Sequence, residues 1–231
     1  MKTLAIIPAR GGSKGIPRKN LKIINGFPLI YFTINSAILA NIFNDVIVST
    51  DDPEIAEVSK MYGAQVPFMR NANLSHDTAN AVDVIKDSIF QMKTLFGKDY
   101  DAGVMLQPTT PMRQKFHYTE TFSQFQLRQH KSLISVCAVS EHPHKMFKIK
   151  RKELDLFLDW PISNPARQTL PQLYIPNGAF YYFEINSFLK YETFNLDDSF
   201  PYVMEKKFSV NIDDNIDFLL AEKLMSLTHE N

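Results

Sequence analysis

The chain has 231 residues, of which 45% are hydrophobic and 22% charged, as is usual for a globular domain. Its 25 basic and 25 acidic residues cancel, and this neutrality argues against nucleic acid or a membrane surface as a partner. The only cysteine, Cys137, cannot form an internal disulfide, and no apolar run reaches the length of a membrane span. The chain also opens on a strand pattern rather than on a signal peptide, so the cytoplasm is the expected compartment.

Short apolar runs alternate with helical patterns from the N-terminus onward. We predict strands at 3–7, 45–49, 65–68, 103–106 and 133–139. Helices are predicted between them at 28–42, 53–62, 78–96 and 116–128. The later part of the chain predicts strands at 178–184 and 208–212 and a last helix at 215–227. This alternation predicts an α/β fold, with a Rossmann-like, mostly parallel sheet covered by helices on both faces.

The alternation breaks between about residues 141 and 176, where His, Pro, Lys and aromatic residues dominate. A segment of this length is too short to build a core of its own. We therefore expect a single domain over residues 1–231, with an insertion at about 141–176 rather than a second domain.

The most informative segment is the glycine-rich loop at residues 8–20, directly after the first predicted strand. It carries four basic side chains, Arg10, Lys14, Arg18 and Lys19. No acidic residue precedes Asp45, so the charge of this part of the sequence is strongly positive. Glycines let a backbone bring its N–H groups close to an anion, and the loop therefore predicts a phosphate site. Its spacing fits neither the dinucleotide-binding G-x-G-x-x-G motif nor a Walker A loop.

This loop closely resembles the signature A-R-x-x-S-K-G-x-x-x-K-N of the N-acylneuraminate cytidylyltransferases, also called CMP-sialic acid synthetases. The matching residues are Ala9, Arg10, Ser13, Lys14, Gly15, Lys19 and Asn20. In that family the loop wraps the triphosphate of CTP, and the fold is of the nucleotide-diphospho-sugar transferase type. The resemblance implies a nucleotide-binding set of Arg10, Gly11, Ser13, Lys14, Lys19, Asn20 and Arg70. It also implies catalytic roles for Arg10, Lys19 and Asp213.

Three further segments resemble the same family. Residues 70–78 match R-x-x-x-L-x-x-D-[ST], whose arginine, here Arg70, lies near the nucleotide. Without the resemblance, Asp77 in this segment is better explained as a cap of the following helix. Residues 106–113 are close to L-Q-P-T-S-P-L-R, and residues 167–179 match R-Q-x-L-P-x-x-Y-x-x-N-G-A.

These segments imply a set of contacts to an acidic sugar. The residues concerned are Gln107, Thr109, Arg113, Lys145 and Arg167. Among them, the resemblance implies that Gln107 faces the sugar acid and that Arg113 is a supporting cation. In relatives the insertion crosses to the partner subunit of a homodimer, and its basic residues reach the neighbour's active site. The resemblance therefore implies a homodimer here, with Lys145 and Arg167 facing the partner's substrate. Such cations suit a substrate that bears a carboxylate.

The segment at residues 208–218 resembles the family's magnesium-binding motif D-I-D-[TS]-x-x-D-[FL]. Asn211 and Asp213 stand at its two metal-binding positions, which implies that they hold Mg²⁺ or Mn²⁺. On a strand, a spacing of two places both side chains on one face, which suits shared coordination of an ion. Asn211 replaces the usual carboxylate and adds no negative charge. The sequence leaves open whether metal binding is weaker, whether Asp214 or Asp217 compensates, or whether Asp217 is only a first-turn acid of the last helix.

The resemblance implies a cytidylyltransferase that transfers CMP from CTP to the anomeric hydroxyl of a nine-carbon 2-keto-3-deoxy sugar acid and releases pyrophosphate. The Asn-Gly-Ala sequence at 177–179 resembles the sialic and legionaminic branches more than the pseudaminic one. The alternatives are the same reaction on a pseudaminic or Kdo-type acid and a non-catalytic nucleotide-binding homologue. The basic loop also raises a nucleic-acid module as an alternative, which the neutral overall charge and the missing stacking motifs disfavour.

Overall fold

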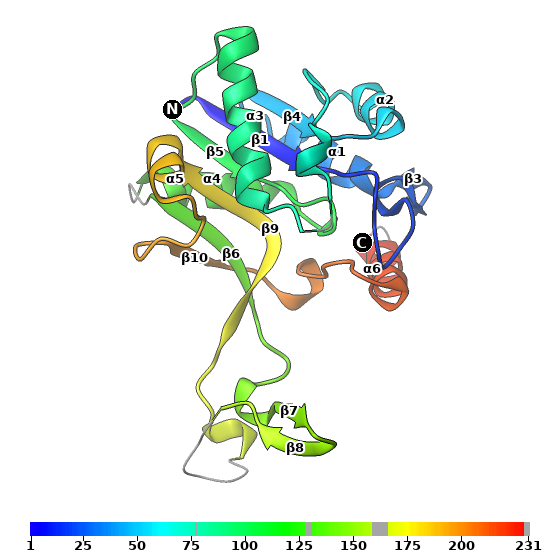
Figure 1. Ribbon diagram of the computed structural model, residues 1–231, viewed down its shortest axis with the longest axis vertical. Coiled ribbons are helices and arrows are strands. Elements are labelled where there is room, and N and C mark those ends of the chain that lie inside the picture. The colour runs from blue at the N-terminus through cyan, green and yellow to red at the C-terminus, as the bar shows by residue number, and fades with distance from the viewer. Residues whose placement is uncertain (77, 128–130, 159–165, 229–231) are drawn as a thin grey trace.

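The computed structural model describes residues 1–76, 78–127, 131–158 and 166–228 (Figure 1). Six strands form one sheet, in the order β10-β6-β9-β5-β1-β4. Their bounds are β1 Thr3–Pro8, β4 Asp45–Ser49, β5 Ala102–Met105, β6 Ser132–Ala138, β9 Tyr174–Glu184 and β10 Phe200–Val203. Strand β1 pairs in parallel with β4 and β5, and β10 pairs in parallel with β6. Strand β9 lies between β5 and β6 and runs antiparallel to both.

Helices cover both faces of this sheet, as the alternating pattern predicts. Their bounds are α1 Leu29–Ala40, α2 Pro53–Met61, α3 Ala81–Phe96, α4 Lys115–Leu127, α5 Ile185–Tyr191 and α6 Asn215–Thr228. In β1, Ala5 and Ile7 join one buried cluster with α1, α4 and α6, whereas Leu4 and Ile6 join another with α3 and α5. This period-two division is expected of a strand buried on both faces. The α/β, mostly parallel fold is therefore confirmed.

Two predicted strands are wrong. Residues 65–68 form no strand, because only isolated bridges, Ile47 to Gln65 and Thr50 to Met69, connect this segment to its neighbour. Residues 208–212 form no strand either: the 3-10 helix Lys206–Phe208 ends there and a loop follows. The last strand is instead β10, which the sequence analysis missed.

Helix α3 begins three residues later than predicted. The side chain of Asn80 accepts a hydrogen bond from the backbone N–H of Val82 and so serves as the N-cap. The predicted cap, Asp77, lies outside the described residues. Among the helices in the described ranges, none is long and apolar enough to cross a membrane.

The predicted insertion projects away from the sheet, at the bottom of Figure 1. We call residues 139–158 and 166–173 the arm; it connects β6 to β9. It contains the antiparallel hairpin β7 Phe147–Lys150 and β8 Glu153–Leu156, whose side chains are all exposed. Arg151 and Lys152 turn this hairpin with positive φ angles of 50° and 71°, as a two-residue loop requires.

The remaining short elements lie in loops. A second small hairpin, β2 Ile23–Ile24 with β3 Phe27–Pro28, leads into α1. Besides the 3-10 helix Lys206–Phe208, the described chain contains the 3-10 helices Lys19–Leu21, Ala72–Leu74, Pro143–Lys145 and Arg167–Thr169. The first of these ends the basic loop, and its position fixes where the loop's side chains lie.

Candidate active site

A cavity of about 510 Å3 opens beyond the carboxyl ends of β1 and β5. We call it the polar cavity. Three segments far apart in the sequence line it: the basic loop after β1, the loop after β5, and the segment before α6. The lining residues are Pro8, Arg10, Ser13, Lys14, Gly15, Lys19, Asn20, Gln107, Pro108, Thr109, Asn211 and Asp213. Nine of the residues predicted to bind nucleotide, sugar or metal are thus brought together at one place.

A hydrogen bond between two residues of the basic loop fixes its shape. Asn20 is buried, and its Nδ2 donates to the carbonyl oxygen of Arg10 at 3.0 Å. Asn20 therefore fixes the loop. Gly11 does not line the cavity; its N–H donates to Asp51 Oδ1 at 3.1 Å. Arg18 pairs with Asp52, so folding neutralises part of the charge that stood uncompensated in the sequence.

The loop also packs directly against the segment before α6. The Nζ of Lys19 donates to the carbonyl oxygen of Ile212 at 2.6 Å and lies 3.5 Å from Asp213 Oδ1. A Cβ on Gly15 would lie 2.1 Å from the carbonyl oxygen of Asp213, so only glycine fits at this approach. The predicted phosphate loop and the predicted metal segment therefore form adjoining walls of one site.

Asn211 and Asp213 contact each other, although the strand that was expected to align them is absent. Asn211 Nδ2 donates to Asp213 Oδ2 at 2.9 Å. Asn211 Oδ1 is buried, and among the described residues it has no hydrogen-bond partner. The Asp213 side chain is 74% exposed and faces the cavity. A buried amide oxygen without a partner and an open carboxylate are suitable ligands for a hard divalent cation.

Asp214 and Asp217 accept hydrogen bonds from each other's backbone N–H at the start of α6. Asp214 Oδ1 accepts from the N–H of Asp217 at 3.0 Å, and Asp217 Oδ2 accepts from the N–H of Asp214 at 3.1 Å. This reciprocal pair is a capping box at the first turn of α6. Neither carboxylate lines the polar cavity. Asp217 is thus a helix-start acid, one of the alternatives that the sequence left open.

The loop after β5 forms the third wall. Gln107 and Thr109 both line the cavity, and the carbonyl oxygen of Thr109 accepts from the N–H of Ile212 at 2.8 Å. Gln107 lies against β9, where Gly178 has a φ of +79°. A Cβ on Gly178 would come within 2.4 Å of Gln107 Oε1, so the glycine leaves room for this amide.

Arg70 and Arg113 do not line the cavity, contrary to the contacts predicted for them. Arg70 is 6% exposed, and its Nε donates to Ser49 Oγ at 3.1 Å. Arg113 is 3% exposed and donates chiefly to backbone carbonyls. Burial lowers the pKa of each to about 10, so both keep their charge at neutral pH. Their motifs gave no sign of burial, so direct contact with nucleotide is corrected for Arg70, and the substrate contact of Arg113 is corrected to the supporting role that the resemblance also implies.

Lys145 lies on the arm, in the 3-10 helix Pro143–Lys145; its side chain is exposed and does not line the polar cavity. The backbone of Arg167 lies in another 3-10 helix of the arm, and its side chain is outside the described part. One chain alone therefore does not bring Lys145 to its own polar cavity.

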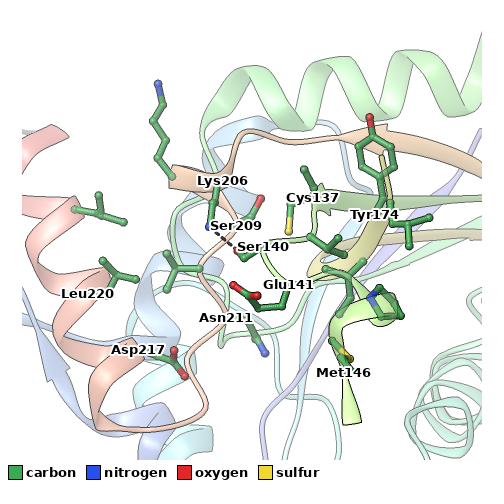
Figure 2. Close-up of a pocket in the computed structure, with 18 residues that line it drawn as sticks. Cys137, Ser140, Glu141, Met146, Tyr174, Lys206, Ser209, Asn211, Asp217 and Leu220 are labelled. Carbon is green, nitrogen blue, oxygen red and sulfur yellow. Dashed lines mark hydrogen bonds between the residues drawn. The ribbon is translucent and has the colours of Figure 1, made fainter. Parts of the chain in front are cut away.

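A second, larger cavity was not foreseen. It has a volume of about 890 Å3 and a largely apolar wall between the base of the arm and α6 (Figure 2). We call it the apolar groove. Tyr174 and Leu220 stand on opposite sides, and Lys206 Nζ closes part of it by donating to Ser140 Oγ at 2.5 Å. Asn211 lines both cavities, so the groove adjoins the site. No local motif could reveal a wall assembled from such distant segments.

Comparisons with known proteins identify the family of this chain. A family model described as cytidylyltransferase matches residues 4–208. The chain is 33% identical to a pseudaminic acid cytidylyltransferase of Campylobacter jejuni, covering 100% of this chain and 99% of the relative. It is 32% identical to a CMP-N,N'-diacetyllegionaminic acid synthase of Legionella pneumophila, with the same coverage. It is also 33% identical to an N-acylneuraminate cytidylyltransferase of Streptococcus agalactiae, but it spans only 52% of that longer protein.

The fold has a known counterpart as well. A solved CMP:2-keto-3-deoxy-manno-octonic acid synthetase, complexed with CTP, superposes with a TM-score of 0.73 at 17% identity. The match covers 99% of this chain and 100% of that one, and at this identity it shows the fold alone. Together with the family model, the full-length relatives confirm the resemblance found in the motifs. The chain belongs to the cytidylyltransferase family, whose members include the N-acylneuraminate, pseudaminic and legionaminic acid enzymes.

Proposed function

We propose that the protein transfers CMP from CTP to the anomeric hydroxyl of a nonulosonic sugar acid and releases pyrophosphate. The observation that supports this most directly is the composition of the polar cavity. It brings a cationic glycine loop together with Asp213, Asn211 and Gln107 around one cavity. Those are the groups that nucleotidyl transfer needs: cations for phosphates, ligands for a divalent ion, and a polar wall for an acceptor.

The basic loop is proposed to hold CTP. Arg10, Lys14 and Lys19 offer positive charge, and Ser13 offers a hydroxyl donor at the same surface. A triphosphate is held by such charge-assisted hydrogen bonds, whose strength grows as water leaves the cavity. Asn20 keeps its amide on the Arg10 carbonyl and so acts on CTP through the shape of the loop.

The cavity fits a divalent metal ion, and we propose Mg²⁺ or Mn²⁺ as the cofactor. Asp213 and Asn211 Oδ1 would hold it, and the phosphates of CTP would complete its coordination. A site with one carboxylate and one amide suits an ion that also binds water and substrate phosphates, as Mg²⁺ does. When bound, such an ion would polarise the α-phosphate and stabilise the departing pyrophosphate.

In the proposed step, the anomeric oxygen of the sugar acid forms a bond to the α-phosphorus of CTP. The bond from that phosphorus to the β-phosphate oxygen breaks, pyrophosphate leaves, and the hydroxyl proton is released. Arg10 and Lys19 stabilise the charge that develops on the phosphates, and Gln107 with Thr109 orients the acceptor. Catalysis of this kind rests on position and electrostatics rather than on a covalent enzyme intermediate.

For the acceptor, we propose an acid of the sialic or legionaminic type. Relatives named for sialic, legionaminic and pseudaminic acids match this chain at 32–33% identity, which supports the class but not one member. Asn177, of the Asn-Gly-Ala sequence, is buried and donates from Nδ2 to Ser209 Oγ at 2.9 Å. Asn177 therefore contacts the segment that leads to Asn211 and does not line the polar cavity. The assignment to the sialic or legionaminic branch depends on the sequence resemblance alone.

We also propose a homodimer in which the arm of one copy packs on the other. On the hairpin, Ile149 is 80% exposed and Leu154 is 71% exposed. An isolated two-stranded hairpin is at best marginally stable in water, so these side chains need a partner surface. The apolar groove offers one, next to the site at which Lys145 of the second copy would arrive. Light scattering of the wild type and of Ile149→Glu tests the homodimer. A dimeric wild type and a monomeric Ile149→Glu protein support it, and a monomeric wild type contradicts it.

Pyrophosphate release from CTP and Mg²⁺ tests the function, with N-acetylneuraminic, legionaminic, pseudaminic and Kdo acids as acceptors. Release with the first or second acid supports the proposal in full. If pyrophosphate is released only with pseudaminic or Kdo acid, the proposed reaction stands but the proposed sialic or legionaminic acceptor is wrong. CTP binding by calorimetry without release in any mixture favours the non-catalytic homologue.

A further inference from the structure

Arg113 is a buried cation that is solvated by backbone rather than by a carboxylate. It is 3% exposed, and among the described residues no acidic side chain forms an ion pair with it. Four backbone carbonyls and the hydroxyl of Thr33 accept its hydrogen bonds. A buried charge left without partners is strongly unfavourable, so this arrangement depends on all of these acceptors being in place.

The four carbonyls belong to two segments that meet beside the polar cavity. Arg113 Nη1 donates to Thr110 O at 2.6 Å, and Nη2 donates to Gln107 O at 2.8 Å. The same Nη2 lies 3.2 Å from Gly178 O, and Nε donates to Ala179 O at 2.7 Å. One planar guanidinium therefore joins the loop after β5 to the middle of β9.

This link holds the backbone of Gln107 beside Gly178. The N–H of Gln107 donates to Gly178 O at 3.3 Å, so the two residues share a backbone bond as well as Nη2 of Arg113. The small space above Gly178, where a Cβ would lie 2.4 Å from Oε1, holds the carboxamide of Gln107. That carboxamide belongs to the wall of the polar cavity, whereas Arg113 does not reach it.

We propose that Arg113 is a positioning residue, which fixes the Gln107 carboxamide toward the sugar acid without touching substrate. This inference rests on the proposed function for the identity of the acceptor. Its effect is expected on the acceptor side of the cavity. The basic loop, which is proposed to hold CTP, is fixed separately by Asn20 and by Lys19.

Two substitutions test the inference. Arg113→Lys keeps the charge but cannot reproduce the planar set of donors, so the loop at 107–110 should lose its link to β9. Gly178→Ala keeps Arg113, but its Cβ would lie 2.4 Å from Gln107 Oε1 and 2.9 Å from Thr110 Oγ1, at a φ of +79° that disfavours alanine, and so it displaces the Gln107 carboxamide. Each should lower kcat/KM for the sugar acid by about 100-fold, mainly through KM, because small misplacements of an orienting group have effects of that size. The Kd for CTP, measured by calorimetry, should change less than about twofold in both.

Asp45→Asn is the control for general loss of stability. Asp45 is buried at the opposite end of the sheet, where it accepts from Lys98 Nζ and Tyr100 OH at 2.6 Å each. This variant should lower the melting temperature yet leave KM for the sugar acid unchanged. A merely structural role for Arg113 predicts the same behaviour for Arg113→Lys.

Hydrogen exchange gives a readout that does not depend on turnover. In Arg113→Lys, the amides of Leu106, Gln107, Thr109 and Thr110 and those of residues 177–180 should exchange faster, whereas those of β1 and β4 should not. Unchanged exchange there, or an equal rise in the Kd for CTP, overturns the positioning role. If Arg113→Lys does not fold, an unchanged KM in Gly178→Ala overturns it. A wild type that turns over none of the four acids contradicts the proposed function instead, while the exchange result still decides whether Arg113 holds this loop.

Discussion

Lys19 and Ile212 are 193 residues apart in the sequence, yet the Nζ of Lys19 donates to the carbonyl oxygen of Ile212 at 2.6 Å. The Lys19 side chain is only 13% exposed, and it also lies 3.5 Å from Asp213 Oδ1. This contact joins the basic loop to the segment that carries the proposed metal ligands. The two halves of the candidate site therefore have a fixed relative position before any nucleotide arrives.

Lys19→Met should lower kcat/KM for CTP by about 100-fold, because it removes both a cation of the cavity and the link to Ile212. The matched control is Lys22→Met. Lys22 also connects this loop to the C-terminal segment, donating to Asn215 Oδ1 at 3.1 Å, but it does not line the polar cavity. Pyrophosphate release from both variants decides the matter, and an equal loss in the two would contradict a special role for Lys19.

Gly15→Ala should destabilise the protein by about 1–3 kcal/mol and weaken CTP binding, because overpacking forces the backbone apart. Its Cβ would lie 2.1 Å from the carbonyl oxygen of Asp213. Gly12→Ala is the control in the same loop, since a Cβ there meets nothing within 4 Å. Thermal unfolding and CTP calorimetry should separate the two variants; a Gly15→Ala protein with wild-type values would show that this close approach is not required.

Arg10→Ala should reduce turnover of CTP by about 100-fold or more while the melting temperature stays near that of the wild type, because Arg10 lines the cavity and faces the proposed phosphates. Arg18→Ala removes the same charge from the same loop. Arg18 is 46% exposed and pairs with Asp52 at the surface, so its loss should matter little. Near-normal kcat/KM in Arg10→Ala would remove it from the proposed machinery.

The stability of the protein should fall as the pH decreases from about 6.5 to about 4, through His117. Burial lowers the pKa of His117 to about 4, whereas in the unfolded chain it is near 6.5. Between these values the unfolded state binds a proton that the folded state does not, so acid favours unfolding. His117→Asn should flatten this part of the curve of unfolding free energy against pH, since Asn can still accept from the N–H of Gln114, as Nδ1 does at 3.0 Å. An unchanged slope would assign it to other groups.

The elements that the sequence predicted well are those with strong local signals. Strand β4 follows its apolar run at 45–49, and α2 begins at Pro53 after an Asp52 cap. The strand at 208–212 failed for a tertiary reason. Its alternating apolar residues Phe208 and Ile212 are indeed buried, but the N–H of Ile212 bonds to a loop carbonyl instead of a neighbouring strand. Alternating burial along this segment therefore occurs without strand pairing.

The sequence motifs predicted most of the residues that line the polar cavity, but not how the residues behind it are placed. Motif resemblance identified the basic loop and the pair at 211 and 213, and the structure brings them together. It named Arg113 only as a supporting cation among the sugar contacts and did not show that this side chain is buried away from the cavity that Gln107 lines, because burial depends on how the loop packs against β9. The apolar groove was invisible for a related reason: its sides come from the arm base and α6, which only the fold places together.

Asn211→Asp should increase the apparent affinity for Mg²⁺ by about tenfold, because a second carboxylate adds charge at the ion. It also removes the hydrogen bond from Asn211 Nδ2 to Asp213 Oδ2 and leaves two carboxylates in contact. The metal-free variant should therefore melt at a lower temperature than the wild type, and Mg²⁺ with CTP should raise that temperature more. Asp214→Ala is the control: it should cost about 1 kcal/mol through the lost cap of α6 and leave the Mg²⁺ dependence unchanged. An Asn211→Asp protein whose melting temperature and Mg²⁺ dependence match the wild type would show that Asn211 is not a metal ligand.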